Sequence, residues 1–587
     1  MNLKVSFDLL TLEVFYEETK DIIIDSIIEK IYQIGSTDIF WEIYSPHNGR
    51  YNLVLSVHPQ LYRIQLTRKN FPYPSKPPSF SMLLRKHLEG GRILDYYLIP
   101  QERIIEFKIK TFPEENKKVI LELMGKYSNL ILVNENNIII DAIKHVPSEI
   151  NRFREVIPGA NYIYPPKSIK IPISELTEDK LESLLNKDIP IRDLILKEIS
   201  HMNPHIVNEI IEDIGNKMAN ILTLTEKNIL KERLLNIKEK IIRREFKPIA
   251  YLINGEPITF SLFPLKEYED LEKKEFDKVY KLVDYIYSYA FEKALFTQKK
   301  NRLLEIIKTN IEKVEEKIKE LDSQIKEGED SEIFKIKGEI LILNQSSIRK
   351  GLEKVTFLNP YNPNEYIEIE LDPSLSAIEN AQKYFKKYKK LKRGISILKD
   401  YKSKLEEELF YLNSIEFSIE NANSLSELME IEEELEKEGY IKEKKEKSQK
   451  KIKKSEPYKF ISSDGFEIYV GKNNKQNDHI TFNLAKPEDI WLHARGIPGA
   501  HVIIKAQDKE VPDSTLYEAG ALAAYFSKGR NSTYVPVDYT FRRYLQKPKG
   551  AKPGFVIYKN EKTIFAKPEE ALIFLSQEFK DSFKVRW

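Results

Sequence analysis

The 587-residue chain contains no cysteine. This absence excludes a disulfide framework, thiolate metal sites and cysteine nucleophiles, and it fits a reducing compartment. Residues 1–8 lack the basic region and apolar run of a secretory signal, and no later stretch of about 18 uncharged apolar residues occurs. We therefore expect a cytoplasmic protein that does not span a membrane.

Three common enzyme motifs are also missing. The sequence has no G-x-x-x-x-G-K-[ST] phosphate loop, no G-x-S-x-G nucleophile turn and no H-E-x-x-H zinc pair. These absences argue against an NTPase, a hydrolase or a metalloprotease. We expect neither a catalytic constellation nor a cofactor.

The length and composition predict a modular protein. A chain of this length exceeds one hydrophobic core, so roughly three to five structural units are expected. Charged residues make up 31% of the sequence, above the average of about 25%, which indicates much exposed helix surface. The net charge of +2 does not itself indicate a nucleic-acid partner, because basic segments can be offset elsewhere.

The first part of the chain predicts an α+β domain. Residues 21–34 place four isoleucines at helical spacing before Gly35, which predicts an amphipathic helix with a glycine cap. Alternating apolar residues and, at the last two positions, short apolar runs predict strands, and a further helix is expected before Gly90 and Gly91. The isoleucines are Ile24, Ile27, Ile28 and Ile31; the strands are expected at 39–43, 51–57, 105–109, 119–123 and 130–133, and the second helix at 80–88.

Residues 175–242 have a wholly helical pattern, with a break at Asn203 and Pro204. Two helices joined by such a tight connection can offer backbone N–H groups to a phosphate. Simple packing of a helical bundle explains the same pattern. Both alternatives stay open.

A long coiled coil follows. Two apolar series alternate spacings of three and four residues, which is the a/d pattern of coiled-coil helices. We expect two antiparallel arms joined by an insert that is not continuous helix, because residues 359–364 carry two prolines and three asparagines. The series are Leu304, Ile307, Ile311, Val314, Ile318, Leu321, Ile325 and Leu398, Tyr401, Leu405, Leu409, Leu412, Ile415, Ile419.

A lysine-rich segment, residues 442–454, has little apolar content and predicts a linker. The following residues predict a compact α+β or mostly β domain with one helix around 514–527.

Basic and aromatic residues alternate in residues 383–393. Lys386, Lys387, Lys389 and Lys390 could contact phosphates without reading sequence. Equally, they could form a solvated helix face with Tyr384, Tyr388 and Leu391 turned inward.

Glu102 and Arg103 stand at the start of the strand expected at 105–109. Strand geometry places Arg103 on the side of the apolar residues, where it needs a carboxylate or phosphate partner. Glu102 points the other way in a regular strand. This pair alone is weak evidence for a site.

Asp489, His493 and His501 are closely spaced, with glycines and a proline between the histidines. They could bind a metal, form a hydrogen-bonded turn or contact RNA. Trp491 could stack on a base or fill the core.

Several segments together resemble the NFACT family. They occur in order over nearly the whole chain: residues 80–91, 122–129, 371–382, 489–501, 527–532 and 537–540. The resemblance implies a multidomain α+β fold. Its parts are an NFACT-N domain (1–170) similar to formamidopyrimidine-type DNA glycosylases, a helix-hairpin-helix domain (171–265), a coiled-coil middle domain (266–440) with a non-helical tip near 327–372, a basic linker (441–456) and an NFACT-R domain (457–587).

The resemblance also implies a function on the ribosome. Family members of this kind bind large ribosomal subunits obstructed by peptidyl-tRNA, recruit alanyl-tRNA and support template-free alanine addition to the stalled chain. The ribosome would catalyse peptidyl transfer, and the factor RqcP is an implied partner. The family's older description as fibronectin-binding proteins motivates a surface adhesin as the alternative.

The family's Asp-Arg pair, linked to tRNA binding, falls on Glu102 and Arg103. Arg85 and Lys86 lie in another family-like segment and are implied tRNA contacts, and Arg530 is an implied RNA or ribosome contact. Glu102 is one methylene longer than the expected Asp. Residues 201–204 depart from the glycine-containing hairpin, and the Met1-Asn2 start lacks the proline nucleophile of the glycosylases.

Overall fold

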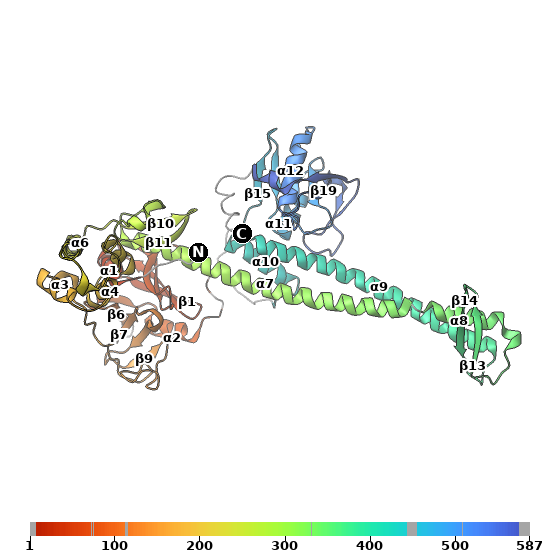
Figure 1. Cartoon of the computed structure of the whole chain (residues 1–587), viewed down its shortest axis with the longest axis horizontal. Coiled ribbons are helices and arrows are strands. Elements are labelled where there is room, and N and C mark those ends of the chain that lie inside the picture. Colours follow the sequence, from red (N-terminus) through yellow and green to blue (C-terminus); the bar gives the residue numbers. More distant parts are fainter. Residues whose placement is uncertain are drawn as a thin grey trace. The chain divides into compact units, whose positions relative to one another are not determined.

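The computed structural model describes residues 7–71, 73, 76–111, 115–329, 331–442, 455–507 and 509–573. The chain forms two compact units, Met1–Ala294 and Leu295–Trp587. Figure 1 labels their helices and strands.

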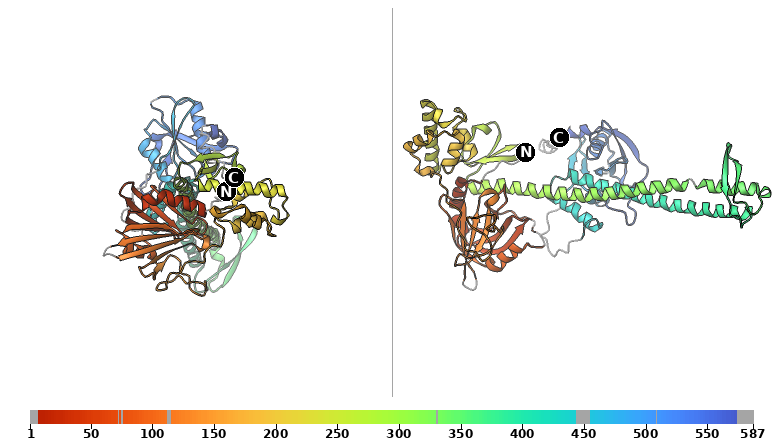
Figure 2. Two further views of the ribbon diagram at one scale, coloured as in Figure 1. Left: turned by 90° about the vertical axis from the view of Figure 1, so that its left-hand side faces the viewer. Right: turned by 60° about the horizontal axis from the view of Figure 1, so that its bottom comes forward.

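The first unit is built on a nine-stranded antiparallel sheet with strand order β4-β3-β2-β1-β5-β6-β7-β8-β9. Figure 2 shows this part of the chain, coloured red to orange, from two further sides. Helices α1 and α2 bury apolar residues that join the core of this sheet. The elements are α1 Leu9–Ile23, β1 Ile27–Ile34, β2 Asp38–Ser45, β3 Gly49–Ser56, β4 Arg63–Thr67, α2 Ser79–Leu88, β5 Arg92–Leu98, β6 Ile104–Thr111, β7 Glu115–Glu122, β8 Asn129–Val133 and β9 Ile139–Ala142. The helix predicted at 80–88 and the five predicted strands are confirmed.

The helix predicted at 21–34 is wrong. Helix α1 ends at Ile23, and most of the segment forms strand β1. A β-bulge between Ile28 and Lys30 shifts the alternation of side chains, so that Ile28 and Ile31 are both buried. The bulge thus produces the three-residue spacing that resembles a helix, and Gly35 lies in the turn to β2 with φ of 63°.

The predicted helical region is confirmed, and a small sheet follows it. The Asn203 side chain caps α5, where its Oδ1 accepts a hydrogen bond from Ile206 N at 2.9 Å. This cap occupies a backbone donor that a phosphate would need, which favours bundle packing. The elements are α3 Glu178–Leu185, α4 Ile191–Glu198, α5 Pro204–Ile210, α6 Leu224–Ile242, β10 Ile249–Ile253, β11 Glu256–Ser261 and β12 Glu272–Glu275.

The antiparallel arms are confirmed in helices α7 (Val279–Glu329) and α9 (Ala377–Asn421). Lys300 Nζ donates to the Glu420 carbonyl at 2.6 Å, and farther along the arm Lys402 pairs with Asp322 at 2.6 Å. Residue numbers rise along α7 as they fall along α9, so the two helices run in opposite directions.

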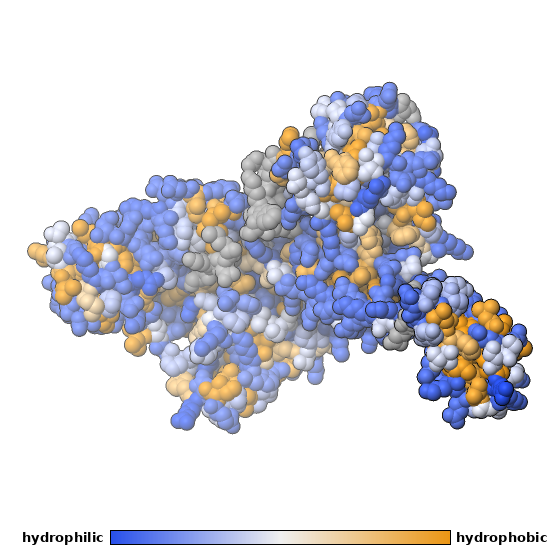
Figure 3. Space-filling model, turned by 45° about the vertical axis from the view of Figure 1, so that its right-hand side comes forward, coloured by the Kyte–Doolittle hydropathy of each residue, from blue (hydrophilic) through white to orange (hydrophobic). Residues whose placement is uncertain are grey.

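The arm ends in a small folded tip. The expected break in the helix is present, but the tip is not wholly non-helical, because α8 (Glu332–Leu343) packs along α9. Strands β13 (Lys354–Asn359) and β14 (Asn362–Glu370) form a hairpin beside it. Figure 3 shows apolar residues gathered on the tip, where Leu343 and Tyr366 are exposed.

The last part of the chain is an α+β domain, as predicted. Its six-stranded antiparallel sheet has the order β15-β16-β18-β17-β19-β22, and α12 packs on one face. Residues 443–454 of the predicted linker and residues 574–587 lie outside the described residues. The elements are β15 Tyr458–Ile461, β16 Glu467–Val470, α11 Asn474–Asp478, β17 Ile490–Ala494, β18 Val502–Ile504, α12 Asp513–Tyr525, β19 Val535–Phe541, β20 Leu545–Gln546, β21 Ile557–Tyr558 and β22 Lys562–Ala566.

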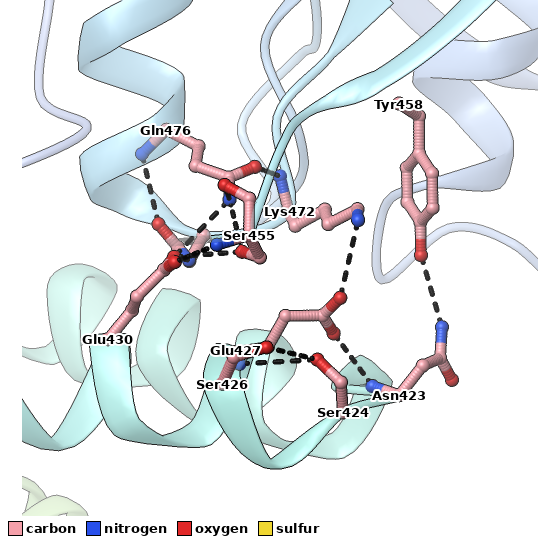
Figure 4. A network of polar contacts seen from close by, with 10 residues as sticks. Asn423, Ser424, Ser426, Glu427, Glu430, Ser455, Tyr458, Lys472 and Gln476 are labelled. Carbon is pink, nitrogen blue, oxygen red and sulfur yellow. Dashed lines mark hydrogen bonds and ion pairs between the residues drawn. The ribbon is translucent and has the colours of Figure 1, made fainter. Parts of the chain in front are cut away.

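Helix α10 (Leu425–Lys437) joins the arm to this domain through polar contacts (Figure 4). The Glu430 carboxylate accepts hydrogen bonds from Ser455 N at 2.6 Å and from Asn473 Nδ2 at 2.8 Å. The nearly buried Glu427 pairs with Lys472 at 3.3 Å. The domain is therefore fixed against the base of the arm.

Candidate nucleic-acid contacts

Glu102 and Arg103 lie in the tight connection between β5 and β6. Gln101 adopts a left-handed backbone conformation with φ of 62°, which turns the chain. The Arg103 carbonyl accepts a hydrogen bond from Leu123 N at 2.9 Å, which anchors the start of β6. The position of Arg103 is thus set by the sheet.

The Arg103 side chain is half-buried against Tyr62. Its Nη1 donates to the Tyr62 hydroxyl at 3.2 Å, and the guanidinium carbon lies 5.7 Å from the centre of the same ring. Within the described ranges no carboxylate pairs with Arg103. The phenol orients the guanidinium without neutralising its charge, so an anionic partner is still favoured.

Glu102 has a different partner. Its carboxylate accepts a hydrogen bond from Ser168 N at 2.6 Å and ties the turn to the following segment. Nearby, Lys170 Nζ donates to the Leu196 carbonyl at 2.7 Å. The pKa of Lys170 is lowered by burial and, to a smaller extent, by the positive charge of Arg103. Lys170 is therefore a second basic side chain near this turn. Sequence reasoning missed Tyr62 and Lys170, because no local pattern marks either residue.

Arg85 and Lys86 lie on α2, away from Arg103. Arg85 Nε donates to the Ile31 carbonyl at 2.6 Å, whereas Lys86 is exposed. The glycine after α2, Gly91, lies against side chains of Ile109 and Thr111 at the far end of β6. A strand of that length spans about 23 Å. The structure therefore does not bring the two predicted tRNA-contact pairs together.

The lysines of α9 form an exposed row beside the tip. Lys386, Lys387, Lys389 and Lys390 are all exposed, and Lys387 Nζ lies 3.9 Å from the centre of the Phe334 ring. Tyr384 and Tyr388 are half-buried and bond inward to the Glu370 carbonyl and to the Glu332 carboxylate. The arrangement matches the alternative of a solvated helix face with the tyrosines turned inward. The lysines on this face are also accessible to phosphates.

Asp489 forms a structural turn. Its buried carboxylate accepts a hydrogen bond from Lys486 N at 2.7 Å and from Ala506 N at 2.9 Å, and it pairs with Lys505. No cluster of three metal-ligating side chains occurs in the described part of the chain. The predicted alternative of a hydrogen-bonded turn is therefore correct for Asp489, and the alternative of a metal site is not supported.

Trp491, His493 and His501 pack together. Trp491 is fully buried in β17, so of the two alternatives its ring fills the core. The His493 ring stacks on it at 5.8 Å with an interplanar angle of 14°. His501 Nδ1 shares a 2.8 Å hydrogen bond with the Thr481 hydroxyl. Burial lowers the pKa of His493 to about 4 and that of His501 well below its usual value, so both imidazoles are neutral at pH 7.

Arg530 is half-buried in the segment that follows α12. Its guanidinium carbon is 3.8 Å from the centre of the Tyr525 ring, at the end of α12. This cation–π contact gives Arg530 a structural role in the domain.

Family models match two parts of the chain. The model for NFACT N-terminal and middle domains matches residues 8–454, and the model for the NFACT protein RNA binding domain matches residues 456–560. The chain belongs to the NFACT family.

Two similar proteins match nearly the full length of this chain, and a solved structure matches about half of it. The Rqc2 homolog RqcH of Bacillus subtilis is 34% identical over 96% of this chain and 98% of its own length. The Rqc2 homolog RqcH of Streptococcus pneumoniae is 32% identical over 97% of this chain and 99% of its own length. The solved C-terminal part of the fibronectin/fibrinogen-binding protein from Streptococcus suis is 33% identical, covering 48% of this chain and 98% of that chain, with a TM-score of 0.38.

The two NFACT models divide the candidate contacts. Arg103 and the α9 lysines lie in the N-terminal and middle domains, whereas His493, His501 and Arg530 lie in the RNA binding domain. Among the described residues, no helix is both long and apolar enough to cross a membrane.

Proposed function

We propose that this NFACT protein is a ribosome quality-control factor. It binds large ribosomal subunits obstructed by peptidyl-tRNA, recruits alanyl-tRNA and supports template-free addition of alanine to the stalled chain. The observation that carries this proposal is the similarity to RqcH proteins over nearly the full length of both chains.

The geometry supports a positioning factor whose chemistry is left to the ribosome. Arg103 presents a charged guanidinium, already oriented by Tyr62, that suits one phosphate of a tRNA. The exposed α9 lysines suit less specific contacts with ribosomal RNA. Peptidyl transfer is then a reaction of the ribosome, and RqcP is a proposed partner in tailing.

The test is to purify the tagged protein from its own cells and sequence the bound RNA. We expect enrichment of large-subunit ribosomal RNA and of tRNA-Ala over other tRNAs. Absence of both RNAs would contradict the proposal, and enrichment of several tRNAs equally would contradict its alanine specificity. Digestion of the protein by protease added to intact cells would favour the adhesin instead.

A further inference from the structure

A cavity of about 760 Å³ lies between α9 and the RNA binding domain. Its walls are the arm residues 404–414, strand β17 and the loop at 548–558. Both sides belong to the second compact unit. The volume falls within the range of about 300–1,000 Å³ typical of small-ligand sites.

The loop that closes the cavity is held in place. Gly554 N donates to Asp478 Oδ1 at 3.1 Å, and Lys552 Nζ lies 4.4 Å from the centre of the Tyr411 ring on α9. Gly554 has φ of 79°, and an added Cβ would lie 2.8 Å from the Asn474 side chain. The cavity is therefore preformed by the fold.

Its lining is aromatic. Phe410 from the arm and Phe555 from the loop remain 41% and 39% exposed, although each lines the cavity. Deeper inside, Tyr558 lies 4.9 Å from Trp491, and His493 stacks on the same indole. Exposed aromatic side chains in a cavity wall mark a binding surface, and their ring faces suit a flat partner such as a base.

Polar groups accompany these rings. The buried Trp491 Nε1 has no hydrogen-bond partner among the described residues, an arrangement that is unfavourable while it stays unsatisfied. The half-buried His493 imidazole is neutral at pH 7 and already hydrogen-bonds to the backbone of Gly499 and Ala494, so it leaves at most one ring nitrogen for a ligand. Exposed Lys404 and Lys549 also line the cavity and can contact a phosphate.

Two carboxylates also line the arm side. Glu408 accepts a hydrogen bond from Tyr440 at 2.8 Å, whereas Glu407 is exposed. They disfavour an anion directly beside them. Because Glu407 and Glu408 lie within one helical turn of Lys404, a bound phosphate is expected at Lys549 on the loop wall.

We propose that this cavity binds a single unpaired RNA nucleotide, with the base between the aromatic side chains and the phosphate at Lys549. Unpaired bases stack on aromatic and histidine side chains and are read through their polar edges, and every base offers a π-face. The inference rests on the proposed RNA-binding function and adds a defined site to it.

The test measures binding of labelled heptaadenylate RNA to the full chain by fluorescence anisotropy. Phe410→Ala combined with Phe555→Ala removes both rings at the mouth, and should weaken binding at least about tenfold. The matched control is Phe565→Ala, which removes a 67% exposed ring from β22 outside the cavity. Lys549→Glu is compared with Lys562→Glu in the same way, because both lysines are exposed and only Lys549 lines the cavity.

A spectroscopic signal locates the base. The chain has three tryptophans, so Trp41→Phe with Trp587→Phe leaves Trp491 as the reporter at the cavity. The RNA should quench Trp491 fluorescence with the affinity found by anisotropy. An unchanged affinity in the Phe410 and Phe555 variant, or quenching by an alanine peptide and not by RNA, would overturn the site.

Co-sedimentation with large ribosomal subunits is measured in parallel. If the subunits are bound but the cavity substitutions have no effect on RNA affinity, this inference fails while the proposed function stands. If neither subunits nor RNA are bound, the proposed function fails as well.

Discussion

The Arg103 turn and the α9 lysine row present positive charge in opposite ways. Arg103 is half-buried, and Tyr62 contacts its guanidinium with both hydroxyl and ring. The four α9 lysines are exposed on long side chains. A pre-oriented guanidinium loses less entropy on binding and can make two directed bonds, whereas lysines act as strongly hydrated point charges. The turn therefore suits one defined phosphate, and the row suits general attraction to RNA.

Arg103→Ala should have the largest effect. Loss of a charged hydrogen-bonded contact of about 1.5–3 kcal/mol weakens tRNA binding by about 10- to 150-fold, so alanine tailing should be abolished. Binding to the large subunit should stay largely intact. Tailing of an obstructed subunit and co-sedimentation measure the two effects separately.

Arg103→Lys is the matched control, because it keeps the positive charge and loses the paired N–H donors of the planar guanidinium. We expect partial tRNA binding. If Arg103→Lys binds tRNA as tightly as the wild type, positive charge alone explains the site. The contrast between the Arg103 turn and the α9 lysine row then disappears.

Reversing the four α9 lysines to glutamate should weaken subunit binding about tenfold and reduce the slope of its salt dependence by about 1 to 3, with less effect on tRNA selectivity. Salt titrations of subunit affinity measure both quantities. The matched control reverses four other exposed lysines of the arm, and an equal loss in that variant would show that only net charge matters. They are Lys308, Lys313, Lys319 and Lys326 on α7.

Tyr62→Phe should have a moderate effect. It removes the hydroxyl that accepts the Arg103 hydrogen bond but keeps the ring, which should weaken tRNA binding by about 2- to 10-fold. Tyr127→Phe, at a 71% exposed position, is the control for tRNA affinity measurements. An unchanged affinity in Tyr62→Phe would mean that the ring alone orients Arg103.

Lys86→Ala should have the smallest effect. Lys86 is exposed at the other end of β6, so its loss should change tRNA affinity by less than about threefold. The same binding assay tests this. A loss as large as that of Arg103→Ala would show that both ends of β6 contact the tRNA together.

Regular periodicity was readable from the sequence, whereas local irregularities were not. The alternation at 105–109 and the heptads of the two arms predicted β6, α7 and α9, because each has one buried face. The bulge at Ile28 imitated a helical spacing, and β12 escaped prediction because its four residues are charged and exposed.

The candidate sites were less predictable than the fold. Arg103 was marked by family resemblance, but its partner Tyr62 lies 41 residues away and meets it only in the folded sheet. The cavity beside Trp491 likewise combines an arm helix with a distant loop. Contacts of this kind are created by tertiary packing, and no local pattern encodes them.

The most direct measurement is sequencing of the RNA bound to three forms of the protein: the wild type, Arg103→Ala and the variant with four reversed α9 lysines. The account predicts that Arg103→Ala loses tRNA and keeps large-subunit RNA, whereas the lysine variant loses large-subunit RNA. Loss of both RNAs together from a folded Arg103→Ala protein, or retention of both, would contradict it.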